Sequence, residues 1–488
     1  NQPRDYYAVI NNCNYYIAHA DTALKSNRNE YIFMKEYAAV KAFRAWTYLQ
    51  LSRQYGAVPY VTEPVTTIGQ INANTSMTDY TTILSGEAQM LEGLKARYTD
   101  EELSVPTFNQ TSRSVGLLNW KDRGQDVEKF INPRKCFIPL NVVLGDIYLE
   151  LGNYERAAQC YYDYLRYAGL NQSISVNYVD NLTTGYSTYS PIFKDFTEWP
   201  ADYNSSKNSS LFTSTPSYVS SFTHSSSPGD VISYIPMAVN YTMGKTTDIP
   251  AAFGYDYYGV GSSSTVDVDD PMSGVFNCPK TEDIQVVPSQ TYCDSARRAQ
   301  YYYYTEQVKV SPFNWIVKNE ALGDARASMI CRGSGADSIY VYTYKPSTAY
   351  VLLYRNATVW LHLAEAINRM GYPDAAFAIL KDGINSNLAT YVLQGDSTDL
   401  LVRGRYIQPA TYQMLRTTVP FLSNENIETF EDNWGIHSRG TNYTRGAFSP
   451  YQMDAVVGKK LDDIAATFNV TSTAYTKQDT INAMEDII

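Results

Sequence analysis

The chain has 488 residues, and its 39 Lys and Arg against 50 Asp and Glu give a formal net charge of −11. This acidic balance, with scattered basic residues, excludes nucleic acid as a partner, because phosphate binding requires a clustered basic face. No apolar run reaches the roughly 18 residues that a membrane-spanning helix requires. A chain of this length contains about two or three domains, or one helical scaffold that carries a large insertion.

The first part of the chain is predicted to be helical. Helices are expected over residues 6–24, 31–55 and 80–98, because apolar side chains recur there at the three- and four-residue spacing of a helix face. Gly56 ends the second of these helices, and residues 60–62 are expected to be extended. Trp46 lies on the apolar stripe of that helix, so it is assigned to packing.

Two predicted helical hairpins share one spaced pattern, which resembles the tetratricopeptide unit, where small residues seat one helix against the next. The first hairpin covers residues 139–168, and the second belongs to a helical pattern over residues 350–381 in which Trp360 is assigned to packing. A single hairpin cannot bury its own apolar face, so more units are expected. The pattern consists of Leu144, Gly145, Tyr148, Gly152, Ala157 and Tyr161 in the first copy, and of Leu363, Ala364, Ile367, Gly371, Ala376 and Leu380 in the second.

The composition then predicts a mainly α protein, with a tetratricopeptide-type helical scaffold and a large irregular, loop-rich lobe that has room for short strands. The lobe is dense in Ser, Thr, Tyr, Gly and Pro, and a short helix is expected in it near residues 321–329. Loops on a rigid scaffold are where binding residues concentrate. The predicted parts are a helical scaffold at 1–170, a variable ligand-binding lobe at 171–347, a tetratricopeptide hairpin at 348–385, an irregular insertion at 386–448 and C-terminal helices at 449–488.

Neither a metal site nor a cofactor is predicted. The six cysteines show no C-x-x-C pair, which argues against structural zinc. Cys278 and Cys293 either form a disulfide, if the protein is exported, or remain thiols. The acidic run at residues 267–270 begins like a calcium loop, but Met272 stands where that loop requires glycine.

The residues also argue against an enzyme. No motif selects a pair of carboxylates for glycoside hydrolysis, and no G-x-S-x-G elbow is present for a serine nucleophile. His362 and Glu365 share a helix face but lack the second histidine of H-E-x-x-H. His362 is therefore expected to be a core or partly exposed histidine.

Four blocks in order resemble the SusD-like (RagB/SusD) family of outer-membrane nutrient-binding lipoproteins. The blocks span about 340 residues, which makes their joint occurrence more specific than any one of them. They are residues 36–59, including Glu36, Arg44, Tyr48, Gly56 and Pro59; the hairpin of residues 144–161; the segment 323–326; and residues 355–371, including Arg355, His362, Ala364, Glu365, Arg369 and Gly371.

The resemblance implies a right-handed tetratricopeptide scaffold whose variable lobe holds the ligand, and it implies no catalytic activity. It also implies a lipid-anchored protein on the outer membrane and cell surface of a Bacteroidetes bacterium, where it acts as a lid over a TonB-dependent SusC-like transporter. Members of the family capture oligosaccharides most often and peptides in some cases. The lipidated N-terminal cysteine and the acidic C-terminal segment of the family are not in this sequence, so membrane contact is expected only through a lipid anchor absent from this chain.

Candidate ligand residues follow from the chemistry of a neutral sugar. Such a ligand is held by aromatic rings stacked on its weakly apolar faces and by polar side chains at its hydroxyl edge. Tyrosine, with 44 residues against 17 Phe and 6 Trp, suits a surface of that kind, although it also replaces Phe at helix interfaces. The alternative for each candidate is a place in the small core of the lobe. The candidates are Trp199, Tyr203, Tyr255, Asp256, Tyr257, Tyr258, Trp315 and Trp434.

The predicted function is therefore binding of an oligosaccharide and its delivery to a SusC-like transporter. Two alternatives stay open at this point. One is a peptide-binding member of the same family, and the other is a helical-repeat adaptor without a small ligand.

Overall fold

We analysed a computed structural model of the chain. It describes residues 2–73, 76–104, 121–122, 125–126, 136–171, 231–236, 252, 257–258, 275–276, 285–289, 291, 302–311, 314–323, 332–334, 340–342, 350–382, 453–468 and 475–488. The described residues are mainly helical, as predicted. The chain divides into two compact units, of which the first comprises Asn1–Asn171, Ile232–Tyr234 and Leu353–Met370, and the second comprises the rest.

The helices occur in both units. Their bounds are α1 Pro3–His19, α2 Met34–Tyr55, α3 Ile68–Ala73, α4 Tyr80–Lys95, α5 Leu140–Glu150, α6 Tyr154–Asn171, α14 Asn356–Arg369, α15 Pro373–Asp382, α19 Met453–Thr467 and α20 Lys477–Glu485.

The described strands pair as small two-stranded sheets. Their bounds are β1 Val58–Pro59, β2 Met77–Thr78, β3 Lys121–Asp122, β4 Gln125–Asp126, β5 Val231–Pro236, β6 Tyr257–Tyr258, β7 Val275–Phe276, β8 Tyr302–Ser311, β9 Asn314–Gly323, β10 Arg332–Ser334, β11 Tyr340–Tyr342 and β12 Tyr350–Arg355.

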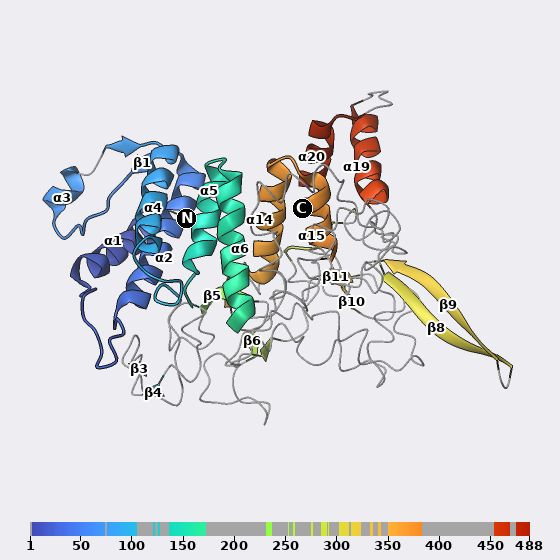
Figure 1. The fold of residues 1–488 in the computed structure, drawn as a ribbon, viewed down its shortest axis with the longest axis horizontal. Coiled ribbons are helices and arrows are strands. Elements are labelled where there is room, and N and C mark those ends of the chain that lie inside the picture. Colours follow the sequence, from blue (N-terminus) through green and yellow to red (C-terminus); the bar gives the residue numbers. More distant parts are fainter. Residues whose placement is uncertain are drawn as a thin grey trace. The chain divides into compact units, whose positions relative to one another are not determined.

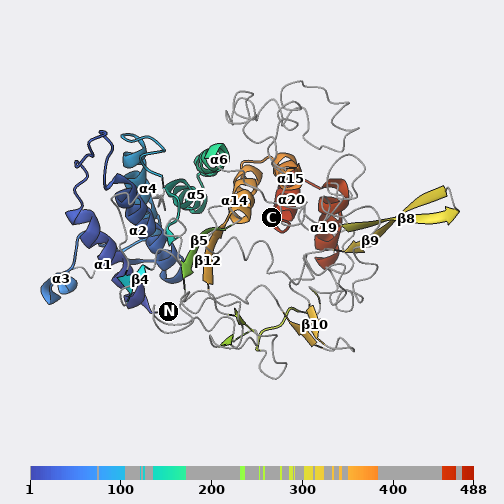
Figure 2. The same cartoon turned by 90° about the horizontal axis from the view of Figure 1, so that it is seen from below.

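In the first unit, α2 is the central helix. It packs against α1, α4 and α5, while α6 packs against α5 and α14 (Figures 1 and 2). The helices therefore lie side by side, each burying the apolar face of its neighbour, as helical hairpin repeats do. Ile10, Tyr48, Leu51, Val58 and Ile83 form one cluster of this core.

Helix ends follow the signals in the sequence. Asp79 caps α4 by accepting a hydrogen bond from the backbone N–H of Thr82. Gly56 follows α2 with φ +72°, and Gly152 separates α5 from α6 with φ +74°, a left-handed conformation that suits glycine. The predicted helix at 6–24 is shorter than expected, because α1 ends at His19.

The predicted close approach in the first hairpin is present. Gly145 of α5 faces the ring of Tyr161 of α6, and a Cβ atom at residue 145 would lie 2.5 Å from Tyr161 Cε1. Tyr161 is fully buried. Only a residue without a side chain allows the two helices to meet at this distance.

The second copy of the pattern also has the predicted turn. The helix α14 ends at Arg369, Gly371 has φ +92°, and Pro373 begins α15. Pro is favoured in the first helical turn, where its missing N–H has no partner to lose. In the second unit, α15 packs against α20, and the Lys477 ammonium lies 5.6 Å from the centre of the Tyr372 ring.

Two helix predictions are wrong. Residues 350–355 were expected to begin the second helical stretch, but they form the strand β12, which pairs with β5. Arg355 at its end has the extended dihedral angles φ −126° and ψ 156°. Residues 321–323, expected in a short helix, belong to β9, which pairs antiparallel with β8 from Tyr302↔Gly323 to Ser311↔Asn314. In both cases a strand partner outweighs local spacing. Residues 324–329 lie outside the described part of the chain.

Candidate functional site

A buried carboxylate on α5 joins four elements of the first unit. Asp146 is 1% exposed, and its Oδ1 atom accepts a hydrogen bond of 2.6 Å from the Tyr161 hydroxyl of α6. The Tyr354 hydroxyl of β12 donates to Asp146 Oδ2. On α14, His362 Nδ1 lies 2.8 Å from Asp146 Oδ1. A buried charge is tolerated when it is paired and hydrogen-bonded in this way.

The electrostatics of this Asp146 cluster favour an ion pair. Burial would raise the pKa of the Asp146 carboxyl, but the hydrogen bond and charge of His362, together with the two tyrosine hydroxyls, hold that pKa below its ordinary value. Burial works against the charged form of His362, but the hydrogen bond and charge of Asp146 raise the pKa of the imidazole above its ordinary value. The contact therefore favours the charged form of each partner over that of the free side chain.

A second, half-exposed pair lies beside the Asp146 cluster. Arg53 of α2 donates through Nε to Glu150 Oε1 at 2.5 Å, and the Tyr80 hydroxyl donates to Glu150 Oε2 at 2.5 Å. The side chains of Arg53 and Glu150 are 37% and 31% exposed. Water screens such a pair, so it contributes less than a buried one.

The Asp146 cluster has the residue types of an acid–base site but not the arrangement of one. Its carboxylate and imidazole are used to hold helices and a strand together, and their described partners supply no serine, threonine or cysteine nucleophile. Cys160 neighbours Tyr161 in sequence, but burial raises the pKa of its thiol to about 12, so it stays protonated. The cluster therefore has a structural role.

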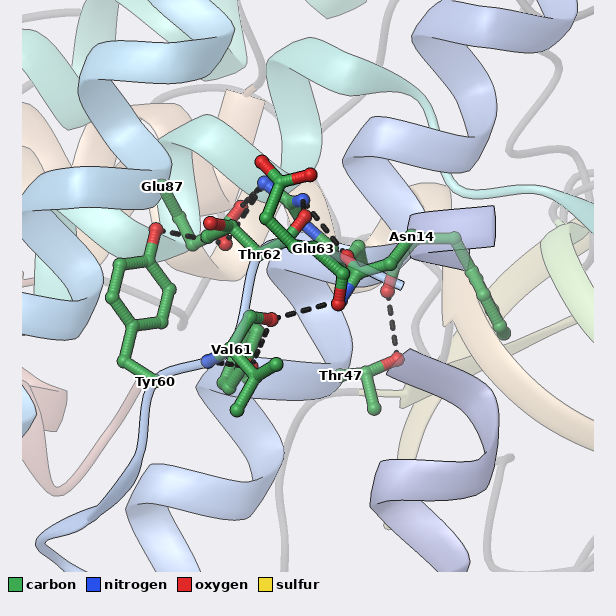
Figure 3. A network of polar contacts seen from close by, with 10 residues as sticks. Asn14, Thr47, Tyr60, Val61, Thr62, Glu63 and Glu87 are labelled. Atoms are coloured by element: carbon green, nitrogen blue, oxygen red, sulfur yellow. Dashed lines mark hydrogen bonds and ion pairs between the residues drawn. The ribbon is translucent and has the colours of Figure 1, made fainter. Parts of the chain in front are cut away.

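A second buried network surrounds the ion pair of Arg44 and Glu87 (Figure 3). Arg44 Nη2 of α2 lies 3.3 Å from Glu87 Oε1 of α4, and the two side chains are 4% and 0% exposed. The Tyr60 hydroxyl donates to Glu87 Oε1 at 3.1 Å. Burial raises the pKa of the Glu87 carboxyl above its ordinary value, and the charge of Arg44 offsets only part of that rise.

The same network anchors residues 61–63, which follow β1. Arg44 Nη1 donates to Asn14 Oδ1 at 3.0 Å, and Asn14 Nδ2 donates to the carbonyl oxygens of Val61 and Glu63 at 2.9 and 3.2 Å. The Tyr48 hydroxyl donates to the Val61 carbonyl at 2.7 Å and accepts from the Val61 N–H at 2.8 Å. Side chains of α1 and α2 thus bond to both backbone groups of Val61 and to the carbonyl of Glu63, which a strand partner would otherwise do. Arg44 and Tyr48, residues of the first family-like block, serve this anchoring.

Two further findings concern metals and membranes. Within the described residues, no three His, Cys, Asp or Glu side chains gather where they would hold a metal ion. None of the helices in the described part of the chain combines the length and apolar character needed to cross a bilayer.

Three of the eight predicted ligand residues lie in described strands. Tyr257 and Tyr258 form β6, opposite Phe276 and Val275 of β7. Trp315 lies in β9, opposite Lys309 of β8. These two sheets are separate, so strand pairing does not bring β6 and β9 together. The other five, together with the two cysteines of the disulfide alternative, lie outside the described residues: Trp199, Tyr203, Tyr255, Asp256 and Trp434, and Cys278 and Cys293.

Comparison with known proteins gives matches among solved structures alone, since no family model and no curated protein matches the sequence. A SusD superfamily protein from Bacteroides thetaiotaomicron matches with 15% identity and a TM-score of 0.43, over 99% of this chain and 82% of that one. The chain is similar to SusD-like proteins.

Two further SusD-like structures match at lower TM-scores. A SusD-like carbohydrate-binding protein from Bacteroides fragilis has 14% identity and a TM-score of 0.32, over 86% of this chain and 69% of that one. A laminarin-binding SusD-like protein also has 14% identity and a TM-score of 0.32, over 78% and 69%. Such values transfer neither a ligand nor a site to this chain.

Proposed function

We propose that the chain is a non-catalytic, SusD-like nutrient-binding protein whose ligand is an oligosaccharide. One observation carries the proposal: three of the four family-like blocks form α2, the hairpin of α5 and α6, and α14, and these helices pack in one unit. Arg44 of the first block pairs with Glu87 of α4, and Gly145 makes room for the Tyr161 ring within the second block. The residues that carry the resemblance thus have a shared structural purpose.

The acid–base groups of the described helices support binding rather than catalysis. Asp146 and His362 bond to each other, and Glu87 bonds to Arg44, all at scaffold contacts. Hydrolysis of a glycan needs two carboxylates placed on either side of a bond. Carboxylates that are buried in scaffold pairs are not available for that task.

We assign recognition of the ligand to the segment 171–347, with a contribution from Trp434. Within this segment, Tyr257 and Tyr258 form β6, and Trp315 lies in β9. Tyrosine and tryptophan rings suit the weakly apolar ring faces of a sugar.

We further propose that the protein acts at the outer membrane, on the cell surface, and delivers its ligand to a TonB-dependent SusC-like transporter. The support is the order and spacing of the four sequence blocks. Co-purification from the native membrane tests this part by itself. A transporter of that class in the eluate is the expected result, and its repeated absence from cells grown on the ligand would refute the partnership.

Calorimetric titration against soluble polysaccharides and a peptide mixture tests the ligand class. At least one glycan is expected to bind with micromolar to millimolar affinity. Binding of peptides with failure of every glycan would overturn the proposal in favour of the peptide-binding alternative. Hydrolysis of any glycan in the panel, detected as newly released reducing ends, would overturn the assignment as a non-enzyme.

A further inference from the structure

The chain passes between its two units at five places, and three of these lie in the paired strands β5 and β12. Residues Ile232–Tyr234 and Leu353–Met370 belong to the first unit, whereas the residues from Ile235 to Leu352 belong to the second. The strands pair with each other as a two-stranded sheet (Figure 2). We call this sheet the stem. The position of the stem on the helices therefore sets where the intervening segment leaves the first unit and where it returns.

The Asp146 cluster attaches the stem to the helices. Tyr354 of β12 is 5% exposed and donates its hydroxyl hydrogen to Asp146 of α5. His362, about two turns into the helix α14 that directly follows β12, bonds to the same carboxylate. A single buried anion thus holds both β12 and the helix that follows it.

This attachment contains one group that can exchange a proton with water near neutral pH. The His362 side chain is 26% exposed, whereas that of Asp146 is 1% exposed. Histidine is the side chain whose ordinary titration falls between about pH 5 and 8. The solvent can therefore change the charge of the cluster through His362 without unfolding the helices.

We propose that the Asp146–His362 ion pair is a proton-controlled latch, which holds the stem on the helices while His362 is charged and weakens when the imidazole becomes neutral. Neutral imidazole still has one N–H to donate, so the stem loses the charge of its partner rather than every contact. What remains is a buried carboxylate supported by two tyrosine hydroxyls. A buried charge without a counter-charge is costly, which favours opening.

The groups around His362 set the direction of this effect. Asp146 of α5 and Glu365 of α14 favour the imidazolium, and Arg53 of α2 opposes it. Arg53 is itself paired with Glu150 of α5. The hydroxyl of Tyr161 on α6 lies 3.4 Å from His362 Nδ1, and the hydroxyl of Tyr354 on β12 donates to the Asp146 carboxylate. Burial and the charge of Asp146 raise the pKa of both tyrosines, so they remain neutral.

The sign of the pH dependence follows from the shifted groups. The pKa of His362 is raised in the folded protein, so its contribution is complete below the ordinary value of about 6.5 and is lost as the pH rises through the folded value. The pKa of Asp146 is lowered, so its contribution is lost only as the pH falls through a value below the ordinary one of about 3.9. The latch is thus closed between these limits and opens on the alkaline side.

Hydrogen exchange of the full chain between pH 5 and 9, corrected for the intrinsic exchange rate, tests the latch. In the wild type, the opening constant of peptides covering residues 231–236 and 350–361 is expected to rise as His362 loses its proton. The rise is about tenfold for each unit by which the pKa of His362 is raised. His362→Gln should remove this pH dependence, whereas the matched control His19→Gln, at an exposed position of α1, should keep it.

Two outcomes would overturn the proposal. One is an unchanged pH dependence of stem exchange in His362→Gln. The other is a low pKa of His362 in NMR. The ring signal of His362 is assigned by its absence from the spectrum of His362→Gln, and a pKa at or below the ordinary value of about 6.5 would contradict the latch. Asp146→Asn provides a second, independent check, because it should move the titration of His362 to lower pH by removing the facing charge.

Discussion

Substitution of Gly145 by alanine tests the packing of the first hairpin. A Cβ at this position would lie 2.5, 2.8 and 2.9 Å from the Cε1, Cδ1 and Cζ atoms of the Tyr161 ring. All three distances involve one rigid ring, so no rotation of a flexible side-chain end relieves them. Tyr161 is fully buried and bonded to Asp146, which leaves movement of the ring or separation of the helices as the only responses.

The magnitude follows from three contributions. Overpacking a filled core costs about 1–3 kcal/mol, and the close contacts place Gly145→Ala toward the upper end. Moving the Tyr161 hydroxyl weakens a hydrogen bond to a charged group, worth about 1.5–3 kcal/mol. Alanine recovers about 1 kcal/mol through its higher helix propensity. The expected net loss in the free energy of unfolding is about 2–4 kcal/mol.

Urea unfolding followed by far-ultraviolet circular dichroism measures this loss, with comparison of the m-values. Gly93→Ala is the matched control, because this glycine also lies in a helix of the first unit and an added Cβ would meet nothing within 4 Å. The control is expected to gain about 0.5–1 kcal/mol. If Gly145→Ala were as stable as Gly93→Ala, the close approach of Gly145 and Tyr161 would be refuted.

Three further predictions concern the ion pairs. Arg44→Met leaves the buried Glu87 without a cation and should cost about 3–5 kcal/mol in urea unfolding, with partial recovery when Glu87 is also made apolar. Asp146→Asn should remove the loss of stability that the wild type shows as the pH falls below about 3.9, measured as the melting temperature against pH. Glu150→Gln should cost at most about 1 kcal/mol, because the pair with Arg53 is half exposed, and this cost should shrink in high salt.

Each of these predictions has an outcome that contradicts it. Full stability of Arg44→Met would mean that the buried pair does not hold α2 to α4. If Asp146→Asn lost stability at acidic pH as the wild type does, other carboxylates would be the cause of that loss. A large, salt-independent loss in Glu150→Gln would mean that the Arg53 pair is shielded from water.

Helix positions and turns were largely predictable because their signals are local. Gly56, Gly371 and Pro373 mark helix ends through their backbone preferences, which act within a few residues. The small residues of the hairpin pattern were also local signals, but the contact of Gly145 with Tyr161 became evident only in the structure.

The strand β12 was not predictable from local spacing. Its apolar run, Tyr350–Arg355, continues into the stripe of α14, and the partner that makes it a strand is β5, far away in the chain. Helical periodicity cannot reveal a partner at that distance. The lesson applies to β9 as well, where pairing with β8 decides the structure.

The buried networks left one signal in the sequence that the prediction missed. Asp146 is a charge between Gly145 and Ile147, on the buried side of α5, and such a residue requires partners. Its partner His362 was expected to be a core or partly exposed histidine, which the structure confirms, but the pairing joins residues 216 apart. Likewise, Arg44 was part of a family-like block, and its partner Glu87 became evident only in the structure.

The most direct test of the proposed function measures where the glycan is held. Calorimetry with the tightest-binding glycan compares the wild type with alanine variants at Trp199, Tyr257, Trp315 and Trp434, and with the control Tyr15→Ala, an exposed aromatic residue on α1. The account predicts that at least one of the four variants binds about tenfold more weakly, or 1.4 kcal/mol, and that the control does not. Unchanged affinity in all four variants, or weakened binding in the control alone, would contradict it.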